Sequence, residues 1–313
     1  MNNLKKIGLT ALGTALVTST AVAGSLDVTG TAGITYVGNS GADNGGSKLT
    51  QKTTISFTGS AELDNGFTVS YYNNISGQEG TNFNQHFDVD MGDAGKLRFA
   101  GNGTSGNGAV GAWDDKTPAA NEESWDIKGG GGETGPVNQQ TGDDSLIYTN
   151  TAIMDGVTVM LNYKPSETTN DSTTGAGLAY TGIDGLNIGV AKEDNNTAAD
   201  EVKNTVVYAT YAMDAFTFGI QNNESDSAAA NADRDFTAWG ISYAVSEDIS
   251  ISYGSSEVDF ENTSLEDQKA DALGVSWTNG SMSVTASRHD IENVAGANDD
   301  DRDATEVNLT FAF

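Results

Sequence analysis

The last ten residues, Ala304-Thr-Glu-Val-Asn-Leu-Thr-Phe-Ala-Phe313, decide the fold that the sequence predicts. Every second position on one face of this stretch is apolar: Val307, Leu309, Phe311 and Phe313. A period of two residues is typical of a β-strand with one face in an apolar environment. The same alternation recurs along the chain in residues 66–76, 84–91, 156–164, 186–192, 216–222, 249–253 and 282–289. The sequence therefore predicts an all-β protein.

The connections between these stretches are alternately short and long. Seven short polar turns lie at residues 64–66, 93–95, 155–156, 184–185, 213–215, 246–248 and 279–280. Several contain Asp-Gly or Asn-Gly, which favour tight hairpin turns. Eight longer loops lie near residues 38–48, 77–81, 103–142, 165–174, 194–201, 224–234, 260–266 and 293–302. Together they delimit sixteen segments, each about the 9–11 residues that a tilted strand needs to cross a bilayer.

Strict alternation of short and long connections favours a transmembrane antiparallel β-barrel. Such barrels have an even number of strands, short turns at the periplasmic end and long loops at the outer end. A soluble β-sandwich is the structural alternative, but it gives no reason for all the long loops to lie at one end. A barrel of about sixteen strands is wide enough to leave an aqueous channel.

The N-terminus predicts export. Lys5 and Lys6 precede a mainly apolar stretch at 7–20 and the small residues Ala21-Val22-Ala23, the layout of a cleaved signal peptide. A single membrane anchor is the alternative, although the stretch is short and contains Thr, Ser and Gly. We therefore expect a signal peptide over 1–23 and a barrel over 24–313.

Composition excludes several functions. The formal charge is −29, and removing Lys5 and Lys6 makes it −29 − 2 = −31. This charge argues against binding nucleic acid. The absence of cysteine excludes disulfides, thiolate metal sites and thiol catalysis. No pattern indicates a cofactor, and an acidic run at 298–303 lacks the spacing of a calcium loop, so we expect neither a cofactor nor a metal site.

In its organisation the whole chain after residue 23 resembles the general porins of Gram-negative bacteria, in particular those of alphaproteobacteria. The C-terminal alternation that ends on Phe313 is similar to the signal read by the outer-membrane barrel-assembly machinery. The long third loop, near 103–142, lies where that family has a constriction loop folded into the barrel, although the Pro-Glu-Phe-Gly-Gly stretch of the enterobacterial loop is missing. The resemblance implies a homotrimer without cofactors in the outer membrane, in contact with lipid and lipopolysaccharide.

Acidic residues predominate in the third loop. It contains six carboxylates and two lysines, Lys116 and Lys128, so its formal charge is −6 + 2 = −4. If the loop folds inward, its carboxylates meet permeating ions, and acidic side chains in a narrow pore favour cations. The alternative is that they form a solvated outer surface. The predicted constriction residues are Asp114, Asp115, Glu122, Glu123 and Asp126, with Glu133 the sixth acid.

Lys52, Lys96 and Arg98 are predicted to form a basic wall opposite the loop. Alternation places them on the inner face if their apolar neighbours face lipid, where a charge near the midplane costs a few kcal/mol. A three-residue turn at 93–95 would pair Asp90 with Arg98. The alternative is that these bases only neutralise acidic groups on the same wall.

The sequence thus predicts an outer-membrane channel for passive diffusion of small hydrophilic solutes and ions, with mild cation preference. A substrate-selective porin for one nutrient, and a structural or adhesive surface barrel without transport, are the alternatives. Catalysis is not expected, because the only hint of a triad, Ser287 with His289, lacks a recognisable acid.

Overall fold

In the computed structural model, residues 26–41, 46–77, 82–101, 108–127, 133–136, 142–166, 171–196 and 201–313 are described. Sixteen strands form one closed antiparallel barrel in which each strand pairs with its neighbours in sequence and β1 pairs with β16. The predicted fold class and strand number are confirmed. The predicted signal peptide, 1–23, lies outside the described residues and remains a prediction.

The strands vary more in length than the sequence predicts. They are β1 (Leu26–Gly41), β2 (Gly46–Glu62), β3 (Thr68–Ser76), β4 (Asn82–Asp90), β5 (Lys96–Ala100), β6 (Ser145–Asn150), β7 (Val157–Lys164), β8 (Thr173–Ile183), β9 (Leu186–Asp194), β10 (Val202–Met213), β11 (Phe216–Ser227), β12 (Arg234–Ala244), β13 (Ile249–Phe260), β14 (Gln268–Asn279), β15 (Met282–Glu292) and β16 (Arg302–Ala312). Among the described residues, three short helices lie between strands: η1 (Gly92–Ala94), α2 (Ala109–Trp113) and η2 (Val294–Gly296). None of the described helices is long and apolar enough to cross a membrane.

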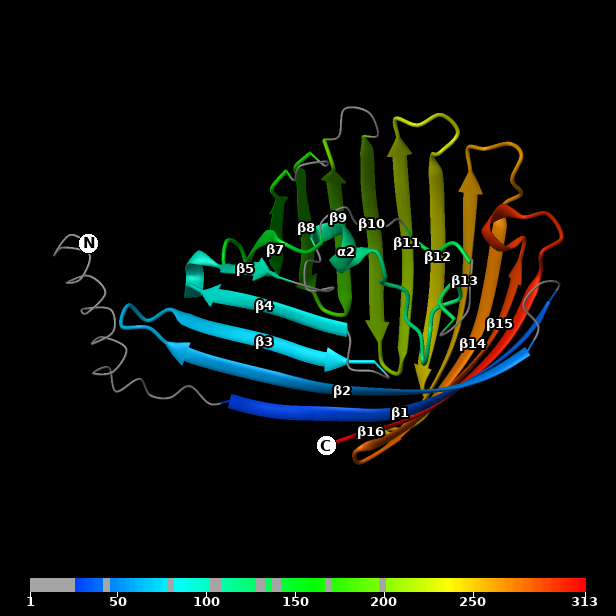
Figure 1. Cartoon of the computed structure of the whole chain (residues 1–313), viewed down its shortest axis with the longest axis horizontal. Helices are drawn as coiled ribbons and strands as arrows, with labels where there is room; N and C mark the ends of the chain where they lie inside the picture. Colours follow the sequence, from blue (N-terminus) through cyan, green and yellow to red (C-terminus); the bar gives the residue numbers. More distant parts are fainter. Residues whose placement is uncertain are drawn as a thin grey trace, which may run out of the picture.

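Figure 1 shows how the strands surround the lumen. Strands β1–β4 (blue to cyan) cross the view from side to side, whereas β8–β13 (green to yellow) run up and down it. Tilted strands on two opposite walls of a barrel cross in this way. The long connection from β5 to β6 carries α2 and lies against the wall that begins at β7, because α2 contacts β7, β8, β9 and β10.

Two predicted loops are shorter than expected. Backbone pairing of β1 with β2 continues to Asn39 and Gly46, within the loop predicted at 38–48. Likewise β11 reaches Ser227, within the loop predicted at 224–234. The loops were predicted from their polar residues. However, two paired strands can continue into water beyond the apolar band, because their backbone hydrogen bonds do not depend on apolar side chains.

The predicted register between β4 and β5 is wrong by two residues. Asp88, not Asp90, pairs with Arg98, and Asp90 pairs with Lys96. The turn is longer than its polar core, because the N–H of Met91 donates to the carbonyl of Gly95 at 2.9 Å around the η1 turn. The side chains still lie on their predicted faces, because a shift of two residues equals one full period of the alternation.

The stretch after residue 143 has apolar side chains on both alternating faces, and it forms β6. Ile147 is buried on the inner face, opposite Arg98, whereas Leu146 is 40% exposed on the outer face. Ile153 and Met154 lie beyond the end of this strand and are exposed.

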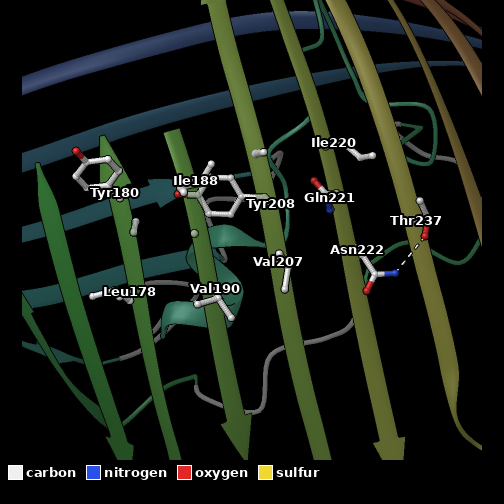
Figure 2. A pocket seen from close by; sticks show the side chains of 13 residues that line it. Leu178, Tyr180, Ile188, Val190, Val207, Tyr208, Ile220, Gln221, Asn222 and Thr237 are labelled. Carbon is white, nitrogen blue, oxygen red and sulfur yellow. Dashed lines mark hydrogen bonds between the residues drawn. The ribbon is translucent and has the colours of Figure 1, made fainter. Parts of the chain in front are cut away.

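The outer surface of β8–β11 is an apolar belt. Leu178, Val190, Val207 and Ile220 project from its strands, and each is at least 46% exposed. Figure 2 views this surface from outside the barrel, with α2 behind the strands. A hollow of about 570 Å³ lies between these side chains. Because its lining is apolar and faces away from the lumen, this hollow belongs to the lipid-facing surface and not to the channel.

The packed core of the protein lies between the third loop and the inner wall. Three groups of buried side chains fill it, each built around loop residues: Val110 and Trp113, then Trp125, then Ile127. Trp125 meets Phe236 edge to face, with ring centroids 4.9 Å apart. The third loop is therefore an integral part of the fold, and the prediction that it folds into the lumen is confirmed.

Candidate functional site

The third loop is fixed to the inner wall by hydrogen bonds along its length. Near its start the N–H of Ala109 donates to Oδ1 of Asn162 on β7 at 3.2 Å. Farther on, the N–H of Lys116 donates to Oε1 of Gln221 on β11 at 2.6 Å. The N–H of Ala120 then donates to Oγ of Ser252 on β13 at 2.7 Å. The loop thus follows the wall from strand to strand.

Asn121 is the most heavily bonded residue at the middle of the loop. Its Nδ2 donates to Oγ of Ser287 at 2.8 Å and to Oε1 of Glu306 at 3.3 Å, and its Oδ1 accepts from Nδ2 of Asn308 at 3.0 Å. These partners lie on β15 and β16. One amide side chain therefore holds the loop to the last two strands, a role that the sequence pattern did not reveal.

The returning part of the loop is anchored near the end of the barrel that carries the long connections. Gln268 accepts from the N–H of Thr134 and donates to its carbonyl, both at 2.8 Å. Arg302 forms a buried ion pair with Glu133, with NH1 and Oε2 2.8 Å apart. The hydrogen-bond and ion-pair anchors named above lie on β7–β16, and Ile127 also packs with Val37 of β1. Because none of these contacts involves β2–β6, we call the inner face of those strands the uncovered wall.

Glycines on the wall allow this close approach. A Cβ atom at Gly219 would lie 2.5 Å from Cδ of Pro118 and 2.9 Å from the carbonyl oxygen of Lys116. At Gly240 it would lie 3.0 Å from the carbonyl oxygen of Pro118. In a strand, such a glycine marks the close approach of another backbone, so the loop lies flat against β11 and β12.

Four of the five predicted constriction carboxyls show raised pKa values. Burial and the neighbouring Asp115 carboxylate raise the pKa of Asp114 to about 7. The same two causes raise the pKa of Glu123 to about 7, and Asp115 and Glu123 share a side-chain hydrogen bond. Desolvation by the surrounding protein, followed by other carboxylates, also raises the pKa of Asp115 and Asp126.

The carboxyl groups of the loop also lie close to one another. Carboxylate oxygens of Glu122, Glu123 and Asp126 all lie within 4.8 Å of each other, and Asp126 is exposed. The loop therefore brings several acidic side chains together at one place. Lys128, which entered the predicted loop charge, lies outside the described residues.

The three bases of the predicted wall are not equivalent. All lie on inner-facing positions, but only Lys96 and Arg98 come together, and both meet Asp88. Arg98 donates to both carboxylate oxygens of Asp88, from Nε at 2.7 Å and from NH2 at 2.9 Å. Lys96 Nζ lies 3.7 Å from Asp88 Oδ2. Lys52 lies three strands away on β2, opposite Gly33 of β1, and is exposed.

The two histidines both lie on the lumen side of the wall but have different surroundings. His86 stacks on Tyr72 with ring centroids 5.0 Å apart on the uncovered wall. His289 is buried under the third loop, where its Nε2 lies 2.8 Å from Oγ of Ser287 and its Nδ1 lies 3.3 Å from the carbonyl oxygen of Ser124. Ser287 and His289 therefore hold the loop to β15, and the group next to Nδ1 is a backbone carbonyl and not an acid.

Comparison with known proteins gives a family and a fold. The family model described as Gram-negative porin matches residues 8–313. No curated protein sequence matches the chain.

Among solved structures, the anion-selective porin from Comamonas acidovorans has a TM-score of 0.71 at 14% identity, covering 92% of this chain and 99% of that one. Salmonella typhi OmpF in complex with daunomycin has a TM-score of 0.72 at 15% identity, covering 93% and 98%. The trimer form of OmpT from Vibrio cholerae has a TM-score of 0.68 at 13% identity, covering 93% and 100%.

Proposed function

The chain belongs to the Gram-negative porin family, and from this premise we propose that it forms a water-filled channel for passive diffusion of small hydrophilic solutes and ions with mild preference for cations. The observation that carries the proposal is the third loop, which is hydrogen-bonded to the inner face of β7, β11, β13 and β15 and carries the predicted constriction carboxyls. A channel needs only a lumen of suitable width and electric field.

Cation preference is supported by the balance of charge on the two sides of the lumen. The loop carries clustered carboxylates, whereas Lys96 and Arg98 on the opposite wall are both bound to Asp88. Lys52 remains as an exposed base on that wall. The fold alone does not fix the sign of selectivity, because the similar porin from Comamonas acidovorans is anion-selective. The sign therefore depends on residues of this chain.

A homotrimer is part of the proposal, and polar groups on the outer face of β3 and β4 support it. Tyr71 OH donates to Oε1 of Gln85, and Asn73 Nδ2 donates to Tyr71 OH, both at 3.2 Å. Asn73 Oδ1 is shielded and has no hydrogen-bond partner among the described residues. These side chains lie near the middle of nine-residue strands, where lipid would leave amides unsatisfied. Tyr71 is 44% exposed, and a polar outer surface of this kind suits contact with a second subunit better than contact with lipid.

Export and assembly complete the proposal. A signal peptide over 1–23 would deliver a barrel of residues 24–313 to the periplasm, and the C-terminal alternation would direct the barrel-assembly machinery to insert it. In the membrane its apolar belt would contact lipid, and its outer loops lipopolysaccharide.

Reversal potentials in planar bilayers under a salt gradient test this function. We expect a reversal potential that indicates cation preference. This preference should decrease as ionic strength rises, because salt limits the range of a charge to about 10 Å at 0.1 M. Replacing Asp114, Asp115, Glu122 and Glu123 together by amides should move the reversal potential toward anions. Replacing Lys52 and Arg98 by Gln should move it the other way.

Two results would contradict the proposal. An unchanged reversal potential in the fourfold loop variant would show that these carboxylates do not line the constriction. A purified wild-type protein that forms no channels would favour the structural or adhesive barrel. Conductance that saturates with one solute class would favour the substrate-selective porin instead.

A further inference from the structure

Asp88 lies at the centre of the positive charge on the uncovered wall. Both of its oxygens are occupied by Arg98, and Oδ2 is also 3.7 Å from Lys96 Nζ and 3.8 Å from His86 Nε2. The Asp88 side chain is 8% exposed, whereas those of Arg98 and Lys96 are 28% and 42% exposed. One shielded carboxylate thus holds the basic groups of β4 and β5 together.

The geometry of the Arg98–Asp88 pair restricts the guanidinium more than a simple ion pair would. Two parallel N–H···O bonds fix both the position and the plane of the group. The register supports this arrangement, because Asp88 and Arg98 face each other directly across β4 and β5. Arg98 therefore lies along the wall and does not extend freely into the lumen.

Charge cancellation accompanies this restraint. Asp88 offsets one of the two formal positive charges of Lys96 and Arg98, both of which form ion pairs with its carboxylate. The field of a close ion pair falls off faster than that of a single charge, so a permeating ion experiences little of Arg98. The carboxylates of the third loop then dominate the field across the lumen.

We propose that Asp88 is a specificity-determining residue of this channel. It holds Arg98 and Lys96 against the β4–β5 wall and suppresses their attraction for anions. The inference rests on the proposed channel function. It adds that Asp88 prevents the positive charges of Lys96 and Arg98 from counteracting the negative charges of the third loop. If Asp88 is removed, two cationic heads are released toward the lumen, although the formal charge changes by only one.

Reversal potentials of matched variants test this inference. Asp88→Asn and Asp90→Asn change the formal charge equally and lie on the same face of β4. We expect the shift toward anions to be about twice as large for Asp88→Asn, because this variant alone also releases bound cations. In a Lys96→Gln/Arg98→Gln background, the effect of Asp88→Asn should fall to that of the control. Such non-additivity is the sign of direct coupling.

Equal shifts for the two single variants, or an undiminished effect in the background lacking both bases, would overturn the inference. If Asp88→Asn does not assemble, Arg98→Lys provides the test, since it keeps the charge and loses the paired hydrogen bonds. A shift toward anions is expected there, and no shift would overturn the inference. A wild-type protein without conductance would instead contradict the channel function itself.

Discussion

At the scale of single residues, the carboxyl groups of the third loop lie close together, and two of them have pKa values near neutral pH. Asp114 and Glu123 have pKa values of about 7, raised by burial and by the nearby Asp115 carboxylate. A carboxyl with a raised pKa is mostly neutral below that pH and charged above it. The loop should therefore become more negative as the pH rises through 7.

This titration predicts that cation preference increases between about pH 5.5 and about pH 8.5. Reversal potentials measured across that range should move toward cations, and Asp114→Asn/Glu123→Gln should flatten the dependence. Histidine titrates in the same range, so the comparison is best made in a His86→Asn background. A pH dependence that persists unchanged in the double variant would refute the assignment.

Residue types and faces could be predicted from the sequence, whereas contacts could not. Alternation placed Lys96 and Arg98 on the inner face. The opposite assignment would have turned their apolar neighbours toward the lumen. The partner of Arg98 depended on the register of a turn whose hydrogen bonds extend beyond its polar core. Asp88, Asn121 and Gln268 act through such contacts and were for that reason missed.

At the scale of elements, β16 both closes the barrel and carries the predicted assembly signal. The N–H of Phe313 donates to the carbonyl of Gly30 at 2.9 Å, and its own carbonyl accepts from the N–H of Gly30 at 2.7 Å. Its ring is 75% exposed on the outer face. Backbone and side chain of this residue therefore have separable roles.

Replacing the ring alone tests the signal. Phe313→Ala keeps the backbone bonds to Gly30, and we expect less protein in the outer membrane, more in the periplasm, and little change in the denaturant midpoint of refolded protein. Phe216→Ala is the control, since Phe216 is also an outward aromatic residue next to a short turn. Wild-type insertion of Phe313→Ala, or an equal defect in the control, would contradict the prediction.

Strand number and the order of short and long connections were predictable because each hairpin carries its own local turn chemistry. Strand lengths were harder to predict, because backbone hydrogen bonds between neighbouring strands can continue beyond the apolar band. The path of the third loop was given only by resemblance, because contacts such as that of Ala120 with Ser252 join residues far apart in the chain.

At the scale of the whole molecule, the barrel has two unlike ends, and its function depends on which end faces the medium. The seven short connections include Gly280 and Ser281 between β14 and β15, whereas the long connection from β15 to β16 spans Asn293 to Asp301 at the opposite end. Family membership and the even strand number favour short turns in the periplasm.

Single cysteines provide a direct test of this orientation, because the chain has no cysteine of its own. Asn279 and Asn298 are both exposed, the first beside a short turn and the second in a long loop. A membrane-impermeant thiol reagent applied to intact cells should label Asn298→Cys and leave Asn279→Cys unmodified until the outer membrane is broken. Labelling of Asn279→Cys from outside would reverse the topology. The anchors at Gln268 and Arg302, near the ends of their strands next to the long loops, would then lie at the periplasmic mouth, and solutes from the medium would pass Asp90 and Lys96 before meeting the acidic loop.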